Sequence, residues 1–251
     1  MKAMPATRLL LLTAVLPLLP AAAACGDHMH QASNRAAFAA TSAPASSGDM
    51  LVVTTDNGVR LRPADGHRVT VDGPTDATWS HHDRTWTLDL SCARHPAPCP
   101  RMPYVRVPDG VSVTVSARNA GIDAAGLTGA LDLTTVNGDV TVTRSGAATA
   151  ALRLATRNGS VRATALDAGR LHAATTNGDV LLACATAPSS VTATTTNGSV
   201  DVTLPHDAPA YTVTATTDNG RPTVAVPTHD ARHGPAMTLT TVNGDGDAHL
   251  G

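Results

Sequence analysis

Apolar and polar residues alternate along most of this chain, and the alternation recurs in units of about 20 residues. The segment 131–142 shows one unit, with apolar residues six and four positions before Asn137 and three and five positions after it. Alternation at period two predicts strands that bury one face. The Asn-Gly pair between them supplies the positive φ that a bend needs. Each unit is therefore predicted to be a strand, a bend and a second strand.

Seven Asn-Gly pairs mark these bends, and the last five intervals between them are 21, 19, 20, 22 and 24 residues. A unit this short cannot hold a core of its own, so successive units are predicted to stack as an all-β solenoid. A simple hairpin at each pair is the alternative, but tandem recurrence with short links favours the solenoid. The structural turns are expected at Asn57-Gly58, Asn137-Gly138, Asn158-Gly159, Asn177-Gly178, Asn197-Gly198, Asn219-Gly220 and Asn243-Gly244.

Composition supports strands over helices. The chain has no Glu, one Lys (Lys2) and one Ile (Ile122), while β-branched Thr and Val are abundant. Those residues favour a pleated sheet, and several strong helix formers are missing. The formal net charge is -2 and the Arg residues are scattered. No basic stripe is present, so a nucleic acid partner is not expected.

The first 25 residues have the layout of a secretory signal. Lys2 and Arg8 precede the apolar run 9–19, which is too short and too Pro-broken for a permanent membrane span. The following segment, Ala22-Ala23-Ala24-Cys25, resembles a bacterial lipobox, in which Cys25 becomes the lipidated first residue. We expect a lipoprotein signal peptide over 1–24, a flexible tether over 25–48 and the repeat domain over 49–251. The protein is then anchored on the outer face of the cytoplasmic membrane, or secreted if ordinary cleavage occurs instead.

An irregular segment at about 72–104 interrupts the repeats and contains both Trp residues. Cys92 and Cys99 lie seven residues apart in it, and outside the cytoplasm they are expected to form a disulfide. His95 lies between them, which leaves a zinc site as the alternative. Farther along, Cys184 occupies an alternating strand position and is expected to be a buried free thiol.

The turns raise the question of calcium, because some β-rolls bind that ion between glycine-rich bends. Calcium needs six to eight converging oxygen ligands. The residues after the last six Asn-Gly pairs form no continuous row of carboxylates, so no metal site is predicted and a calcium-dependent adhesin is kept as an alternative. Those residues are Asp139, Ser160, Asp179, Ser199, Arg221 and Asp245.

Catalytic material is sparse in this sequence. Enzymes built on β-helices cleave glycans with paired carboxylates in a groove that often has aromatic walls. This chain has two Trp, two Tyr, one Phe and no Glu. The densest group of reactive residues is His81, His82 and Asp83, between Trp79 and Trp86. A non-enzyme without a cofactor is predicted, with a glycan-active enzyme as the alternative.

Two phrases carry a family resemblance. One is Val-Arg-Val-Pro-Asp-Gly-Val-Ser-Val at 105–113, and the other is Leu-Asp-Leu-Thr-Thr-Val-Asn-Gly-Asp-Val-Thr-Val at 131–142. Together with the tandem units, they make 49–251 similar to the bacterial toast-rack family, also known as putative adhesins of unknown function. The resemblance implies a right-handed, single-stranded β-helix at the cell envelope, in a family sometimes attached to membrane-stress systems. It implies no catalytic residues.

These observations predict a cell-envelope lipoprotein that acts as a binding or structural scaffold. Its expected partners are the membrane, through the lipid anchor, and an envelope protein or glycan.

Overall fold

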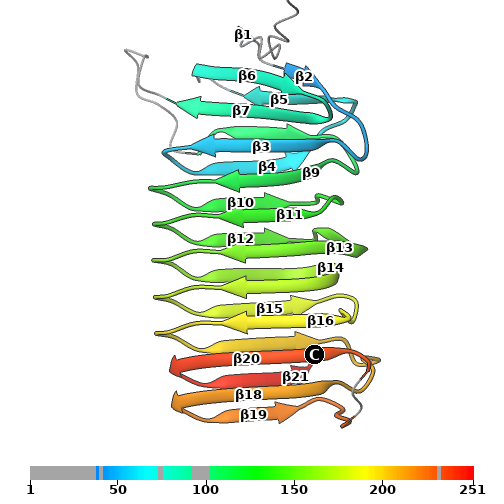
Figure 1. Ribbon diagram of the computed structural model, residues 1–251, viewed down its shortest axis with the longest axis vertical. Coiled ribbons are helices and arrows are strands. Elements are labelled where there is room, and N and C mark those ends of the chain that lie inside the picture. The colour runs from blue at the N-terminus through cyan, green and yellow to red at the C-terminus, as the bar shows by residue number, and fades with distance from the viewer. Residues whose placement is uncertain (1–37, 40–41, 73–75, 92–101, 231–232) are drawn as a thin grey trace, which may run out of the picture. The chain divides into compact units, whose positions relative to one another are not determined.

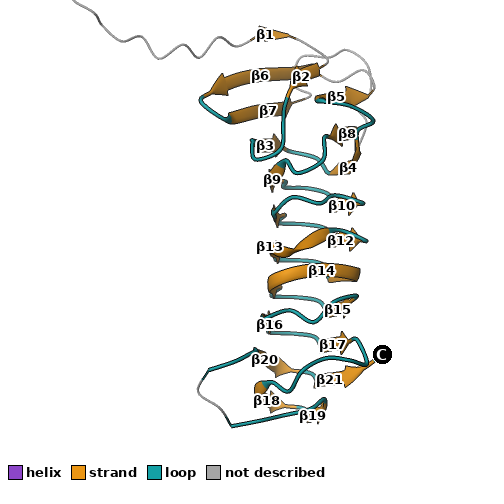
Figure 2. Cartoon of the chain, turned by 90° about the vertical axis from the view of Figure 1, so that its right-hand side faces the viewer, coloured by secondary structure: helices purple, strands orange, loops and turns teal. Residues whose placement is uncertain are grey.

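The computed structural model describes residues 38–39, 42–72, 76–91, 102–230 and 233–251. These residues form 21 strands and no helix, and the strands stack into a solenoid with two sheets (Figures 1 and 2). The predicted all-β solenoid is therefore confirmed. Cys25, Cys92 and Cys99 lie outside the described residues, so their lipidation and pairing stay predictions.

The two sheets run along opposite sides of the stack (Figure 2). Sheet A contains, in spatial order, β1 (Phe38–Ala39), β6 (Asp76–His82), β7 (Thr85–Ser91), β3 (Met50–Thr55), β9 (Ser112–Ser116), β11 (Leu131–Thr134), β13 (Gly146–Ala155), the end of β14 (Val161–Ala174), β16 (Ser190–Thr194), β20 (Ala236–Asn243) and β18 (Thr212–Asn219). Sheet B contains β2 (Ser42–Pro44), β5 (Arg68–Asp72), β8 (Tyr104–Val107), β4 (Val59–Pro63), β10 (Ile122–Ala125), β12 (Val140–Thr143), the start of β14, β15 (Val180–Cys184), β17 (Val200–Leu204), β21 (Gly246–Leu250) and β19 (Pro222–Ala225).

Each regular coil contains one strand of each sheet, joined at an Asn-Gly bend. Strands pair with the equivalent strands of neighbouring coils in parallel register, so Leu131 lies beside Val113 and Leu152. In sheet B, Val140 lies beside Ile122 and Val161 in the same way. These inward columns are fully buried. Parallel pairing between coils agrees with the predicted solenoid corner and not with a hairpin at each bend.

In two neighbouring coils, a large inward residue on one sheet accompanies a small one on the other. Leu154 of sheet A is followed in its coil by Ala163 of sheet B, and the next coil has Ala173 and then Leu182. All four side chains are buried. A large residue on one sheet thus accompanies a small one on the other, which keeps the core filled at a constant thickness.

The coils do not stack in chain order at either end of the solenoid. The coil formed by β3 and β4 has two neighbours. The coil of β7 and β8 lies on one side of it, and the coil of β9 and β10 lies on the other. The last coil of the chain, β20 and β21, lies between β16–β17 and β18–β19 (Figure 1). Tandem recurrence in the sequence predicted sequential stacking. Pro222 begins the outermost strand β19, where a missing N–H costs no ladder hydrogen bond, so this residue suits an edge coil.

Two expected irregular segments contain regular structure. Within the expected tether 25–48, β2 pairs antiparallel with β5, and Ala43 and Ala45 are buried against the core. Within the expected irregular segment 72–104, β6 and β7 form an antiparallel hairpin, and β7 also pairs with β3. Its alternating Trp86, Leu88 and Leu90 face inward and extend the core, which explains why the segment folds as strand.

Candidate functional site

The Asn side chains at the bends form a ladder along one edge of the stack. In each adjacent pair, the Nδ2 of one Asn donates to the Oδ1 of the other at 2.8 to 2.9 Å. The spatial order follows the coils, not the chain: Asn137, Asn158, Asn177, Asn197, Asn243 and Asn219. Asn57 lies outside this ladder, and its backbone N–H donates to Thr55 Oγ1 at 3.1 Å. The ladder joins six coils side by side.

The Gly of each pair lets neighbouring bends approach closely. Gly178 has φ of +145°, a conformation that other residues rarely adopt. A Cβ there would overlap the carbonyl oxygen of Gly159 on the next coil. Gly198 repeats both features, with φ of +148° and a Cβ position that would overlap the carbonyl oxygen of Gly178. The bends are therefore packed backbone against backbone.

The residues after Asn-Gly form a second ladder, in which Asp and Ser alternate through space. Asp139 Oδ1 accepts from the Ser160 N–H at 2.8 Å, and Ser160 Oγ accepts from the Asp179 N–H at 3.2 Å. The same pattern continues through Ser199, Asp245 and Arg221. A Ser coil between two Asp coils keeps their carboxylates two strand spacings apart, about 10 Å. Among the described residues no group of three potential metal ligands occurs.

Thr residues two positions before each Asn complete the bend. Their hydroxyls donate to backbone carbonyls of the adjacent coil at 2.7 to 2.8 Å. The donors are Thr135, Thr156, Thr175, Thr195, Thr217 and Thr241. Turn side chains thus bond mostly to neighbouring turns, which makes the turn edge a structural element. A binding surface is better sought on the outward faces of the sheets.

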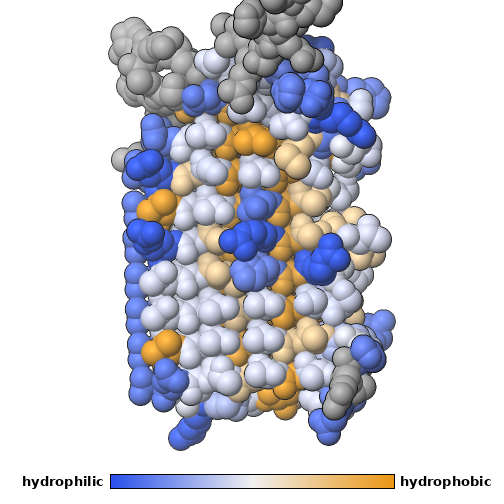
Figure 3. Space-filling model, in the orientation of Figure 1, coloured by the Kyte–Doolittle hydropathy of each residue, from blue (hydrophilic) through white to orange (hydrophobic). Residues whose placement is uncertain are grey.

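Figure 3 looks onto sheet A, where hydrophilic residues gather over the middle strands and near-neutral residues cover β16, β20 and β18. By register, the middle group contains Asp132, Arg153 and His172 on adjacent strands. Arg153 Nε lies 3.7 Å from Asp132 Oδ1. Burial, followed by the nearby charge of Arg153, lowers the pKa of His172. This group is small, and its Arg153 and Asp132 side chains pair with each other.

Sheet B carries a denser cluster of charged and aromatic side chains on β4 and β8. We call it the Arg–Tyr patch: Arg60, Arg62, Tyr104 and Arg106. β4 and β8 place Arg60 beside Tyr104 and Arg62 beside Arg106, so the four residues form a square on the outward face. The Tyr104 ring is 40% exposed. Its centroid lies 5.3 Å from Arg60 Cζ and 5.9 Å from Arg62 Cζ, within cation–π range.

Two carboxylates border the Arg–Tyr patch. Arg62 Nη2 donates to Asp123 Oδ2 at 2.7 Å, and its Nη1 donates to the carbonyl oxygens of Leu61 and Asp123 at 2.8 and 3.0 Å. On the opposite side, Arg106 Nε donates to Asp72 Oδ2 at 3.1 Å. Arg62 is therefore fixed in place. Three guanidinium groups face two carboxylates, which leaves a local excess of positive charge.

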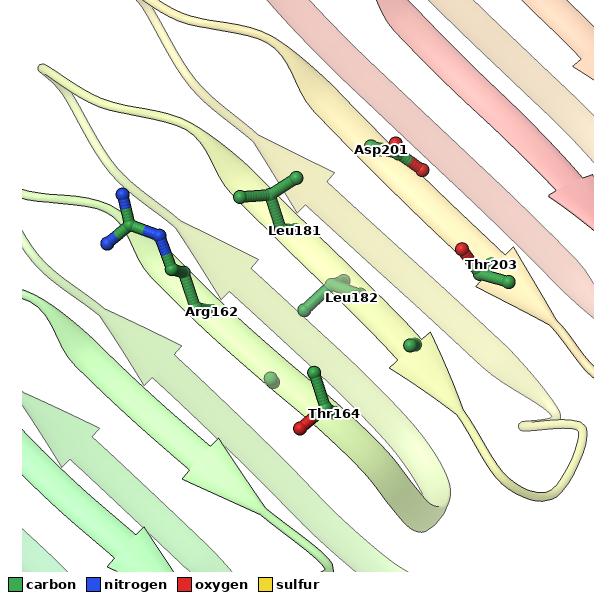
Figure 4. Close-up of a pocket in the computed structure, with 8 residues that line it drawn as sticks. Arg162, Thr164, Leu181, Leu182, Asp201 and Thr203 are labelled. Atoms are coloured by element: carbon green, nitrogen blue, oxygen red, sulfur yellow. The ribbon is translucent and has the colours of Figure 1, made fainter. Parts of the chain in front are cut away.

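A shallow depression of about 280 Å³ lies farther along sheet B (Figure 4). Leu181, 38% exposed, lines it from the middle strand β15, and Arg162 and Thr164 on β14 and Asp201 and Thr203 on β17 line its two sides. Arg162 is engaged by Asp139 Oδ2 at 2.6 Å. The depression is open and lies on a flat sheet.

Beside this depression, three side chains stand in the order of a nucleophile, a base and an orienting acid. Thr203 Oγ1 lies 3.1 Å from His249 Nε2, and His249 Nδ1 lies 3.5 Å from Asp201 Oδ1. Acyl transfer also needs N–H donors aimed at the developing oxyanion. Here the nearby backbone groups belong to paired strands β17 and β21. The three side chains form a cross-strand polar group rather than an assembled catalytic site.

The reactive group expected at 81–83 lies on the β6–β7 hairpin. His81 stacks on Trp86 with centroids 4.0 Å apart, and His82 Nε2 lies 3.2 Å from Asp83 Oδ2. Trp79 and Trp86 are buried and meet edge to face at 6.3 Å. The Trp rings therefore belong to the core and do not form a sugar-stacking wall.

The sequence matches a family model over residues 106–250, which is more than half of the chain, and that model describes the toastrack domain DUF4097. The chain belongs to the toastrack DUF4097 family. The resemblance found in the sequence is thus confirmed. A comparison with curated proteins gave no match.

Three solved structures resemble this toastrack protein. A putative adhesin from Bacteroides fragilis is 12% identical, with 87% of this chain and 98% of that chain covered and a TM-score of 0.39. A putative adhesin from Parabacteroides merdae is 12% identical, with coverages of 86% and 96% and a TM-score of 0.39. A putative cell adhesion protein from Clostridium sporogenes is 7% identical, with coverages of 86% and 98% and a TM-score of 0.36. Similarity at this level identifies no shared ligand.

Two other features of the toastrack chain bear on its site. No helix among the described residues is long and apolar enough to cross a membrane. Cys184 is buried and free, as predicted, and burial raises the pKa of its thiol to about 12. It is accordingly a core residue and a poor nucleophile at neutral pH.

Proposed function

We propose that this toastrack protein is a non-catalytic binding module of the bacterial cell envelope, anchored through a lipid on Cys25. The observation that carries the proposal is the Arg–Tyr patch on the outward face of sheet B. It gathers three guanidinium groups and one exposed Tyr side chain on the outward face of two paired strands. Tyr and Arg are the residue types that dominate binding energy at protein surfaces.

The stacked coils support this role because they hold the patch rigidly. Arg60 and Tyr104 come from distant parts of the chain and are fixed in register by β4 and β8. Arg62 is held by three hydrogen bonds. A surface organised before the ligand arrives loses little conformational entropy on binding. The lipobox-like segment before Cys25 supports placement outside the cytoplasm.

The anchor is tested by labelling cells with an alkyne analogue of palmitate and comparing the native protein with Cys25→Ala. We expect label and membrane association only in the native protein. Label on the variant, or an unlabelled soluble native protein, would contradict the anchor.

The binding role is tested by crosslinking intact cells that express either protein, followed by capture. We expect a specific envelope component to be recovered with the anchored protein. If none is recovered and the purified protein instead degrades cell-wall polymers, the proposed role is wrong and an enzyme is indicated.

A further inference from the structure

We propose that the Arg–Tyr patch binds a carboxylate-bearing polysaccharide. This inference rests on the proposed binding role and names its ligand class. Within the described part of the chain, Arg60, Arg62 and Arg106 pair with Asp72 and Asp123, so three guanidinium groups share two carboxylates. A ligand that supplies spaced single carboxylates completes this pairing.

Two of the three Arg residues have donors to offer. Among the described residues, the ion-pair contact of Arg60 is at 3.9 Å from Nε to Asp123 Oδ2, and its side chain is 39% exposed. That distance exceeds a hydrogen bond. Arg106 is engaged through Nε, and its Nη1 and Nη2 make no other hydrogen bond among the described residues. A guanidinium fork pairs with a carboxylate through two parallel hydrogen bonds.

The surroundings of the patch favour a hydroxyl-rich chain over an acidic protein segment. Protein anchors need a desolvated apolar pocket. The positions that flank the patch on neighbouring strands are Thr70 and Asp72 on β5 and Asp123 and Ala125 on β10, and Thr141 and Thr143 follow on β12. Beside the two carboxylates, these positions offer hydroxyl groups and one methyl group, and none carries a large apolar side chain. A sugar chain can place its carboxylates on the Arg residues and its hydroxyls along these Thr residues.

The Tyr104 position fits the same ligand. Its side chain is exposed, and the guanidinium groups of Arg60 and Arg62 lie near its ring. An amphipathic ring beside charged donors can contact the apolar C–H face of a sugar while its hydroxyl group takes part in hydrogen bonding. We expect binding that weakens with salt, because the Arg side chains are solvent-exposed.

The experiment measures binding of the purified mature protein to immobilised polygalacturonate, with dextran as the neutral polymer and polyglutamate as the acidic peptide. The test variant combines Arg60→Gln with Arg106→Gln, and Arg62 is left intact because it anchors Asp123. The matched control is Arg153→Gln, an Arg of sheet A that is 56% exposed and pairs with Asp132. Circular dichroism verifies that all variants keep the strand content of the native protein.

We expect the native protein and the Arg153 variant to bind polygalacturonate alike, and the double variant to bind at least about tenfold more weakly, since one charged hydrogen bond exceeds the free energy of a tenfold change. Tyr104→Ala should also weaken binding. Neither dextran nor polyglutamate should bind comparably. Equal binding of polyglutamate, equal loss in the Arg153 variant, or no binding of polygalacturonate would each overturn the proposal.

The same variants separate this proposal from the proposed function. If the double variant still captures an envelope component from cells as the native protein does, binding takes place elsewhere on the solenoid. The polysaccharide site is then wrong while the binding role stands. If no variant captures anything, the binding role fails first.

Discussion

Replacing Gly by Ala should have opposite effects at two positions of this solenoid. Gly178 lies in a bend with φ of +145°, and an added Cβ would overlap the carbonyl oxygen of Gly159. Gly246 is a buried residue of β21, and it lies in register with Val200 of β17 and Pro222 of β19. A Cβ at Gly246 would meet no atom within 4 Å, and its φ lies outside the positive region. The same methyl group is thus excluded at one site and accommodated at the other.

The magnitudes follow from the local geometry. Gly178→Ala carries a backbone strain of roughly 1 to 3 kcal/mol. It also pushes apart a bend in which the Gly178 N–H donates to Asn197 O at 2.8 Å, and each lost hydrogen bond costs about 1 kcal/mol. We expect a loss of about 3 kcal/mol. Gly246→Ala should stabilise by about 1 to 2 kcal/mol, because the unfolded chain loses freedom and one methyl group becomes buried.

Urea unfolding followed by circular dichroism measures both effects through the midpoint, provided the slope is unchanged between variants. Gly66→Ala serves as a surface control, since a Cβ there meets nothing within 4 Å. If Gly178→Ala were neutral, or if Gly246→Ala destabilised the protein, the described packing of the bends and of the last coil would be refuted.

Three further predictions concern other contacts. Ser160→Asp places three carboxylates on adjacent coils. We expect it to lower stability by about 1 kcal/mol at low salt and by less at high salt. An unchanged thermal midpoint at low salt would contradict the Asp/Ser ladder. Tyr211→Phe removes the buried hydroxyl that donates to Pro188 O at 2.5 Å and should cost about 1 to 3 kcal/mol in urea unfolding, while Tyr104→Phe on the surface should be nearly neutral. Burial lowers the pKa of His172 in the folded protein. The contribution of the neutral side chain to the free energy of unfolding is therefore fully present above the ordinary pKa of 6.5, and it is lost as pH falls through the lower folded value. His172→Thr should therefore reduce the loss of stability on acidification below the ordinary pKa of 6.5, measured by urea unfolding at a series of pH values, and an unchanged pH dependence would argue against the lowered pKa of this half-buried side chain.

The repeat unit could be predicted from sequence because its signal is local. Inward residues alternate around every Asn-Gly pair, and both the strands and the bends follow from a window of about 12 residues. The stacking order could not be predicted in the same way. Val191-Thr-Ala-Thr-Thr-Thr-Asn-Gly and Val213-Thr-Ala-Thr-Thr-Asp-Asn-Gly are nearly identical, so either coil matches the same neighbour. Only packing beyond the unit distinguishes them.

Two residues did contain information about that order. Pro222 begins a strand that tolerates a missing donor, which indicates an edge. Arg221 interrupts the alternation of Asp and Ser in the sequence, yet the alternation is unbroken in space up to this residue, because the last coil lies before it. The Arg–Tyr patch had no comparable local signal. Arg60 and Tyr104 become neighbours only through the long-range pairing of β4 with β8.

The displaced position of the last coil constrains how the protein can be built. Residues 236–250 are synthesised after β18 and β19, yet they occupy an interior position with a neighbouring coil on both sides. The nascent chain can add coils in order up to β17, but the coil of β18 and β19 has no final neighbour until β20 and β21 have emerged from the ribosome. Assembly of these coils must therefore wait for residues 236–250. Loss of these residues would leave two coils without their partner, and it should be far more damaging than removal of a coil that has only one neighbour.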